Sequence, residues 1–225
     1  VRYKGTKTVA VTPDYSEVAK LSDLWLHPKQ GTDAALAMAI GHVIMKEFHV
    51  AGRSDYFQDY CRRFTDMPFL VRLIEKDGRY VPDRFVRASD FADNRGEANN
   101  PDWKPLVIDE ATGWAVVPTG SVGFRWGEQG KWNLEMRNAA TGVEVHPKLT
   151  LIDAHDDAVP VAFPYFGSRT HPYFAGTEHA DVLLRTVPVK RLALKDGETP
   201  VATVFDLLAA NYGVDRGLGG EAARS

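Results

Sequence analysis

Apolar and polar positions follow two different patterns along the chain. Between residues 6 and 64, the apolar runs TKTVAVT and LWL have the composition of strands, and DYSEVAKLSD between them has helical spacing. A longer helix is predicted in AALAMAIGHVIMKEFH, where Leu36, Ile40, Val43 and Ile44 recur at i, i+4, i+7 and i+8. SDYFQDYCRRF predicts a further helix. The order strand, helix, strand, helix is typical of a parallel α/β unit.

From residue 67 onward the pattern changes to short strands separated by turn residues. FLVRLIEKDGRYV and RLALKDGETPVATV each carry an Asp-Gly pair between two strand-like runs, at Asp77-Gly78 and Asp196-Gly197, which predicts two β-hairpins. PLVIDEATGWAVV, GSVGFRWGEQGKWNLEM and TGVEVHPKLTLID predict further strands, and ADNRGEANNPDW predicts a surface loop. VFDLLAANYGV predicts a closing helix that ends at Gly213.

We therefore predict an α/β fold that begins with a partial Rossmann-like, parallel βαβα nucleotide-binding unit. A mainly β, hairpin-rich region and a closing helix follow it. The predicted divisions are 1–66 for the nucleotide-binding part, 67–200 for the hairpin-rich insertion, and 201–225 for the helix and tail that return to the α/β part.

Composition restricts the possible partners and the compartment. The 225 residues are 44% hydrophobic, enough for a sizeable core, and the net charge of −3 leaves no basic excess for nucleic acid. The single cysteine, Cys61, excludes an internal disulfide and a cysteine-bound iron–sulfur or zinc site, which favours the cytosol. The longest nearly uncharged run, residues 31–45, is too short for a membrane span. Because the sequence starts at Val1 and enters a strand at once, we interpret it as a fragment.

Two loops have the composition of a nucleotide site. Thr12-Pro13-Asp14 follows the first strand, where an acidic side chain at the carboxyl edge of a parallel sheet can accept hydrogen bonds from ribose hydroxyls. Gln30-Gly31-Thr32-Asp33 precedes the long helix, whose free N–H groups favour a phosphate. The Asp33 carboxylate could also accept from the adjacent N–H groups of guanine. The alternative is that Asp14 and Thr32 or Asp33 are ordinary helix N-caps, each contributing about 1 kcal/mol.

Other candidate residues favour structural roles. Residues 153–157, DAHDD, could offer ligands to a metal, but adjacent carboxylates in a loop are usually solvated. Several histidines lack the spacing of a metal pair or the partner of a catalytic triad. Cys61 beside two arginines could have a lowered pKa. Trp126 and Trp132 could line a substrate funnel, although core packing is the more frequent role. The histidines considered are His42, His49, His155, His171 and His179.

Specific motifs give the sequence a family resemblance. The first 49 residues closely resemble the catalytic alpha subunits of the membrane-bound respiratory nitrate reductases, within the molybdopterin oxidoreductase (dimethyl sulfoxide reductase) superfamily. The likeness continues through DYFQDYCRRFTDMPFLVRL, GSVGFRWGEQGKWNLE, FPYFG and ANYGVDRGL. KQGTDAALAMA together with GFRWGEQGKWNLE is specific to the nitrate reductase branch, whereas Gly-Thr-Asp alone marks only the superfamily.

The resemblance implies molybdenum bis(molybdopterin guanine dinucleotide) as the cofactor, with this segment binding a guanine nucleotide arm. The residues so implied are Thr12, Pro13, Asp14, Tyr15, Lys29, Gln30, Gly31, Thr32 and Asp33. The molybdenum ligand and a 4Fe-4S cluster would belong to other parts of the full subunit. The fragment alone is therefore expected to be inactive.

The resemblance also implies an activity and partners for the full subunit. It would reduce nitrate to nitrite with quinol-derived electrons, together with an iron–sulfur beta subunit and a membrane gamma subunit, peripherally on the cytoplasmic side of the bacterial cell membrane. A nitrite oxidoreductase, a selenate or chlorate reductase, and a non-catalytic nucleotide-binding module remain alternatives.

Overall fold

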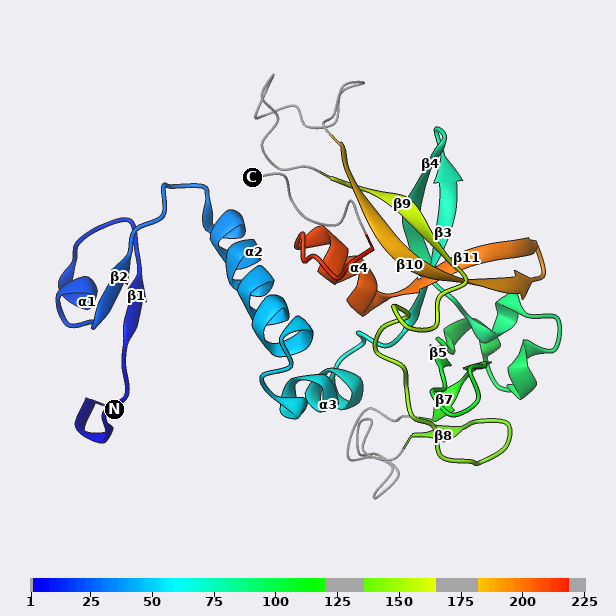
Figure 1. The fold of residues 1–225 in the computed structure, drawn as a ribbon. Helices are drawn as coiled ribbons and strands as arrows, with labels where there is room; N and C mark the ends of the chain where they lie inside the picture. Colours follow the sequence, from blue (N-terminus) through cyan, green and yellow to red (C-terminus); the bar gives the residue numbers. More distant parts are fainter. Residues whose placement is uncertain (1, 120–135, 165–181, 219–225) are drawn as a thin grey trace. The chain divides into compact units, whose positions relative to one another are not determined.

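The structure, a computed structural model, describes residues 2–119, 136–164 and 182–218 (Figure 1). The chain divides into two compact units, an amino-terminal unit of Val1–Ile44 and a carboxyl-terminal unit of Met45–Ser225. Each unit contains helices and strands, so the mixed α/β class predicted from the sequence is correct. The predicted division into residues 1–66, 67–200 and 201–225 stays a prediction.

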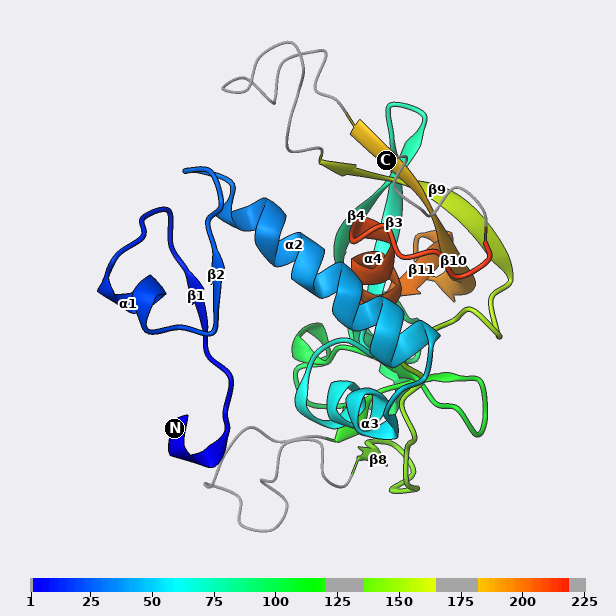
Figure 2. The same cartoon turned by 60° about the vertical axis from the view of Figure 1, so that its left-hand side comes forward.

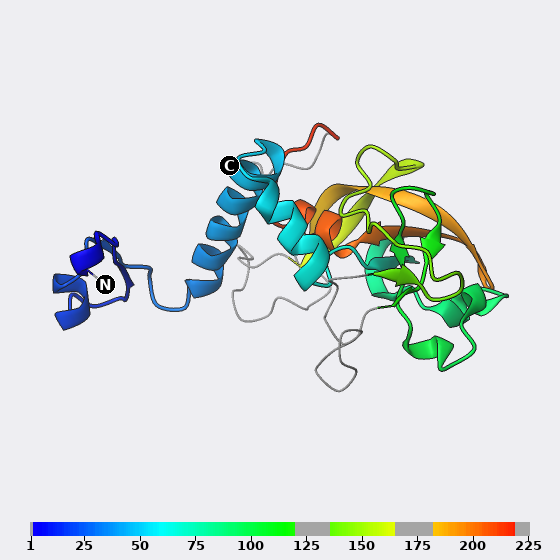
Figure 3. The same ribbon diagram turned by 90° about the horizontal axis from the view of Figure 1, so that it is seen from below.

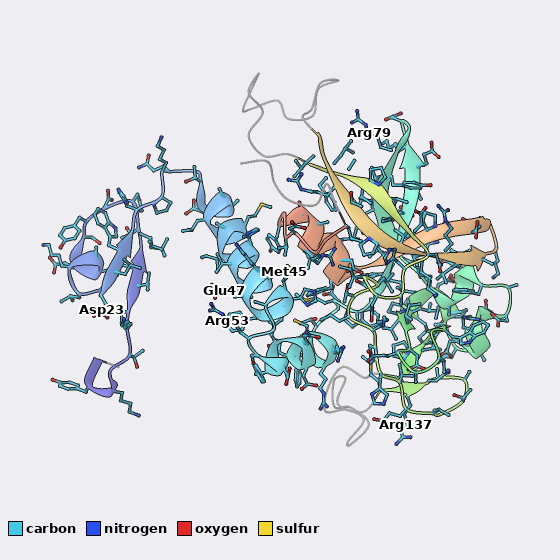
Figure 4. All side chains as sticks on the ribbon, viewed as in Figure 1. Asp23, Met45, Glu47, Arg53, Arg79 and Arg137 are labelled. Atoms are coloured by element: carbon cyan, nitrogen blue, oxygen red, sulfur yellow. The ribbon has the colours of Figure 1, made fainter. Side chains whose placement is uncertain are left out.

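The amino-terminal unit contains a small parallel sheet. Strands β1 and β2 pair in parallel, with Val9 opposite Leu24 and Val11 opposite Leu26, and the short helix α1 connects them. Just before the two strands begin, the Thr8 N–H donates to the Asp23 carboxylate at 2.7 Å. Asp23 is labelled in Figure 4. The elements are η1 (Arg2–Lys4), β1 (Val9–Val11), α1 (Glu17–Lys20), β2 (Leu24–Leu26) and α2 (Asp33–Ile44).

The apolar residues of this unit are mostly exposed. Ala10 and Ala19 are buried, whereas Val9 and Val11 of β1 remain 55% and 51% exposed. Helix α2 forms where its apolar spacing predicted a helix, yet none of its residues is buried. The predicted apolar face is therefore present but is not part of a core in the described chain.

The carboxyl-terminal unit begins with helices and continues with strands. Its first element is a π-helical turn, η2, whose Glu47 accepts from Arg53 at 2.6 Å (Figure 4). The predicted helix SDYFQDYCRRF forms as α3. The elements are η2 (Met45–Val50), α3 (Asp55–Phe64), β3 (Leu70–Lys76), β4 (Arg79–Phe85), η3 (Ala88–Asp90), η4 (Asn94–Gly96), η5 (Pro101–Trp103), β5 (Val107–Ile108), β6 (Ala115–Val116), β7 (Pro118–Thr119), β8 (Arg137–Asn138), β9 (Asp157–Pro164), β10 (Val182–Leu194), β11 (Gly197–Thr203) and α4 (Val204–Asn211).

Five of these strands close into a barrel in the order β10, β11, β3, β4, β9. Four of the five contacts between neighbouring strands are antiparallel, and the long curved strand β10 takes part in two of them (Figure 3). The barrel is closed by the parallel contact of β4 with β9, where Tyr80 lies opposite Val161. This closing contact consists of one residue pair, whereas the other strand contacts each contain three or more. The sequence predicts hairpins in this region but not a barrel.

Both predicted hairpins are confirmed. β3 and β4 join at Asp77-Gly78, where both residues have positive φ (53° and 71°), as a tight two-residue hairpin turn requires. β10 and β11 join at Asp196-Gly197, and Gly197 has φ 121°. The prediction of a strand in TGVEVHPKLTLID is wrong, because within it only isolated bridges form, at Glu144 and Pro147.

The barrel strands contribute alternate residues to two apolar clusters. Leu70 and Val201 belong to one cluster, whereas their neighbours Val71 and Ala202 belong to the other. Helix α4, the predicted closing helix, packs against β10 and β11 (Figure 2) and adds Leu207 to the second cluster. Helix α4 therefore covers part of the barrel with apolar side chains near the end of the described chain.

Candidate functional site

The first predicted loop, residues 12–15, leaves β1 and leads to α1. Its main chain is ordered by the N–H of Asp14, which lies 3.4 Å from the Thr12 hydroxyl, and by the N–H of Ser16, which donates to the Asp14 carbonyl at 2.9 Å. Ser16, not Asp14, occupies the N-cap position of α1. The alternative that Asp14 is an ordinary N-cap is therefore wrong. Its exposed carboxylate has no partner in the described chain.

The second predicted loop, residues 29–33, makes a tight corner at the start of α2. Both the N–H and the hydroxyl of Thr32 donate to the Lys29 carbonyl, at 3.0 Å and 2.6 Å. Gly31 has φ 79°, which favours glycine, although its surroundings are open. Asp33 is the first helical residue, and its exposed carboxylate has no partner within the described ranges.

Trp25, which sequence analysis did not single out, contacts residues of the first loop. It lies on β2 opposite Ala10, and its Nε1–H donates to the carbonyl of Thr12 at 2.9 Å. Its ring lies 5.1 Å from Tyr15 and 4.8 Å from His27, measured between ring centroids. His27 starts the segment that leads to the second loop. Trp25 therefore contacts two residues of the first loop and one residue that precedes the second loop.

The predicted site residues are brought together only in part. Residues 12–15 and 29–33 belong to the same compact unit and lie at the ends that follow β1 and β2. Within the described part of the chain, however, no hydrogen bond joins the two loops. Trp25 contacts the first loop and also His27, which precedes the second loop in the sequence, so the tryptophan in LWL is the sequence signal for this aromatic contact.

The other candidate residues have structural environments. Cys61 is buried, and burial raises the pKa of its thiol to about 11, so the lowered pKa considered from the sequence is wrong. In residues 153–157, Asp153 lies 3.2 Å from Lys148, Asp156 accepts from the N–H of Arg191, and Asp157 pairs with the Arg191 guanidinium at 3.0 Å. These carboxylates therefore hold the chain around β9 and β10. Among the described residues, no group of three or more His, Cys, Asp and Glu side chains could hold a metal ion.

The structure describes three of the histidines considered from the sequence, and the other candidate histidines and tryptophans lie outside the described residues. His42 lies in α2, and His155 Nδ1 lies 2.8 Å from the Ile152 carbonyl oxygen. His49 lies in η2 with its ring 4.6 Å from that of Phe205, and burial lowers its pKa. The positions Trp126, Trp132, His171 and His179 lie outside the described residues.

Within the described ranges, no single helix is long and apolar enough to cross a membrane. The segments Asp33–Val50 and Asp55–Phe64 meet the length and composition criteria only when taken together as a bent pair.

Comparison with known proteins gives strong matches to one group. The chain is 61% identical over 220 residues to the respiratory nitrate reductase 2 alpha chain of Escherichia coli, and 57% identical over 219 residues to the respiratory nitrate reductase 1 alpha chain of the same organism. It is 42% identical over 224 residues to the nitrate reductase alpha chain of Bacillus subtilis. These alignments cover 97% to 100% of the chain but only 17% to 18% of each relative. No family model matches. Over the segment that it spans, the chain belongs to the family of the nitrate reductase alpha chains.

Proposed function

We propose that the chain is part of the catalytic alpha subunit of a nitrate reductase, which reduces nitrate to nitrite with quinol-derived electrons. The observation that carries this proposal is the identity of 42% to 61%, along nearly the whole chain, to three alpha chains that are named as nitrate reductases. A perchlorate reductase alpha subunit is less similar, at 35% identity over 56% of the chain. The same observation favours nitrate over selenate or chlorate as substrate, and reduction over nitrite oxidation. It also favours an enzyme segment over a separate nucleotide-binding module.

Within such a subunit, we infer that the amino-terminal unit is a partial Rossmann-like unit that binds one guanine nucleotide arm of molybdenum bis(molybdopterin guanine dinucleotide). The exposed groups of this unit fit that ligand. The first N–H groups of α2 have no intrahelical acceptor and can donate to a phosphate. The exposed carboxylates of Asp14 and Asp33 supply acceptors, and the molybdenum centre of the bound cofactor would supply the oxygen-atom transfer chemistry.

The proposed roles follow from the position of each loop. Asp14, after β1, would accept hydrogen bonds from ribose hydroxyls, and Asp33 would accept from the ring N–H and the exocyclic amine of guanine. The open surroundings and positive φ of Gly31 would allow the nucleotide to approach the main chain of the corner. The other residues of the two loops, 12–15 and 29–33, would complete the surface around the nucleotide.

The rest of the proposal concerns the larger assembly. The remainder of the alpha subunit would hold the molybdenum ligand and a 4Fe-4S cluster. An iron–sulfur beta subunit and a membrane gamma subunit would pass electrons to it, on the cytoplasmic side of the bacterial membrane. These partners are proposed from the family, since the chain spans less than a fifth of the length of its relatives.

Asp33→Asn in the longer alpha chain tests the proposed nucleotide contact. If the carboxylate pairs with guanine, the amide presents a donor to a donor, and such a buried polar mismatch lowers cofactor retention about ten- to hundredfold. If Asp33 only stabilises the start of α2, the change affects helix stability by about 1 kcal/mol or less and leaves the cofactor in place.

Asp55→Asn is a matched control, because Asp55 occupies the corresponding first position of α3. Guanine nucleotide and molybdenum content per polypeptide are measured for wild type and both variants, together with nitrate-dependent oxidation of a reduced dye. Loss of nucleotide from Asp33→Asn alone supports the contact. Equal content in all three proteins would refute it, and wild-type protein without nitrate turnover would refute the proposed activity.

A further inference from the structure

Three aromatic side chains beside the loops of the proposed nucleotide site, Tyr15, Trp25 and His27, are joined by ring contacts through Trp25, and we call them the aromatic row. The Tyr15 and Trp25 rings meet edge to face at an interplanar angle of 63°, and the Trp25 and His27 rings are tilted by 42°. Tyr15 is 60% exposed, His27 is exposed and Trp25 is partly buried. The two outer rings therefore present open surface, and the middle ring supports them.

Trp25 holds this aromatic row in a fixed position. Its main chain pairs with Ala10 in the parallel sheet, and its side chain is anchored at the end of β1 by the hydrogen bond to the Thr12 carbonyl. Both attachments restrict the indole ring. Tyr15 and His27, in contrast, lie in the segments that follow β1 and β2, where ligands bind in parallel α/β sheets.

We propose that Tyr15, Trp25 and His27 form a stacking platform for a planar bicyclic heterocycle, the guanine base of the nucleotide arm. This inference rests on the proposed function and adds to it residues that recognise the flat face of the base, whereas Asp33 would recognise its edge. Aromatic side chains bind the π-face of a base by stacking. A platform of this kind explains why polar loops are accompanied by exposed rings at one end of the sheet. Trp25 acts as a positioning residue, Tyr15 packs edge-on against Trp25, and exposed His27 supplies the face on which the base stacks.

The experiment compares His27→Ala, His27→Phe and Asp33→Asn in the longer alpha chain that carries this segment. The measured quantity is the rate constant for release of guanine nucleotide from the purified protein, by chromatography of the free nucleotide over time. Removing one stacking ring is expected to accelerate release about tenfold, whereas His27→Phe keeps an aromatic face and should release at the wild-type rate. Because His27 is exposed, both variants are expected to fold, which circular dichroism checks.

Each outcome decides a separate point. Fast release from His27→Ala with wild-type release from His27→Phe supports the platform. Fast release from both His27 variants overturns stacking, because an aromatic replacement would then be insufficient. If Asp33→Asn releases faster but His27→Ala does not, the platform is wrong and the nucleotide site remains. Wild-type release from all three variants overturns both proposals, and the aromatic row is then covered by another segment of the longer chain.

Discussion

Asp206 offers the sharpest test of how the carboxyl-terminal unit is held together. Its side chain is fully buried and accepts four hydrogen bonds. One oxygen accepts from the Thr150 hydroxyl at 2.5 Å and from Arg216 at 2.6 Å, and the other accepts from the Leu151 N–H at 2.8 Å and the Thr203 hydroxyl at 2.9 Å. The carboxylate therefore joins α4 to the chain before β9 and to the segment after α4.

The substitution Asp206→Asn is expected to be costly in either orientation of the amide. A hydroxyl can rotate to accept, but each carboxylate oxygen also faces one donor that cannot, Arg216 on one side and the Leu151 N–H on the other. The Asn NH₂ group must therefore oppose a fixed donor, and the side chain of Arg216, only 2% exposed, loses this negative charge. Removing one partner of a buried ion pair costs about 3–5 kcal/mol. That loss is a large part of the stability of a typical domain.

Urea unfolding of the 225-residue chain, followed by circular dichroism, measures this change. The control is Asp59→Asn, because Asp59 pairs with Arg63 at 2.8 Å on the surface of α3 and should contribute less than about 1 kcal/mol. In the double variant Asp206→Asn, Arg216→Met, the amide can turn its NH₂ group away from Leu151. We therefore expect the two substitutions to be coupled by more than about 1 kcal/mol. A loss below about 1 kcal/mol for Asp206→Asn, or strictly additive effects, would refute the reasoning.

Two further predictions concern titratable groups of the same unit. Burial, together with the nearby Arg216, lowers the pKa of His49, so the unfolded chain binds a proton at this residue more readily than the folded chain does. The free energy of unfolding should therefore fall as the pH drops from about 7 to about 5. The variant His49→Phe should reduce this fall. An unchanged pH dependence of the urea midpoint in His49→Phe would contradict this. Burial raises the pKa of Cys61 from 9.0 to about 11, which lowers its thiolate fraction about a hundredfold at neutral pH. A thiol reagent should therefore label the folded chain far more slowly than the urea-unfolded chain. Similar labelling rates would argue against a buried thiol.

Local sequence signals predicted the elements whose geometry depends on few residues. The Asp-Gly turns specify hairpins because Asp77 and Gly78 adopt the backbone angles that the turn needs. The apolar periodicity predicted α2, and the apolar run after Thr203 predicted α4. In both cases the information lies within one or two helical turns. The sequence alone therefore supports statements about single elements more strongly than statements about their partners.

Long-range contacts could not be predicted in this way. Closure of the barrel depends on Tyr80 meeting Val161, two residues whose pairing has no local signature. The strand expected in TGVEVHPKLTLID instead forms isolated bridges, and the partner of Pro147 is Asp109, far away in the sequence. Asp206 is likewise fully buried and contacts Leu151 and Arg216, and nothing in VFDLLAANYGV predicts either property.

The candidate site likewise contains residues that local motifs predict and residues whose roles depend on long-range contacts. Its loops were predicted because Asp14, Gly31 and Asp33 belong to short motifs with known chemistry, whereas Trp25 was read only as part of an apolar strand. A tryptophan on such a strand can pack within a core or reach past the end of its neighbour, and only the fold distinguishes the two. Here Trp25 reaches the Thr12 carbonyl, so the register of a two-stranded parallel sheet determines where Tyr15 and His27 can lie. Shifting β2 by one residue would turn the indole to the opposite face and separate the rings. The apolar strand thus sets the geometry of the polar loops, and substitutions in β1 or β2 can alter ligand binding without touching a ligand.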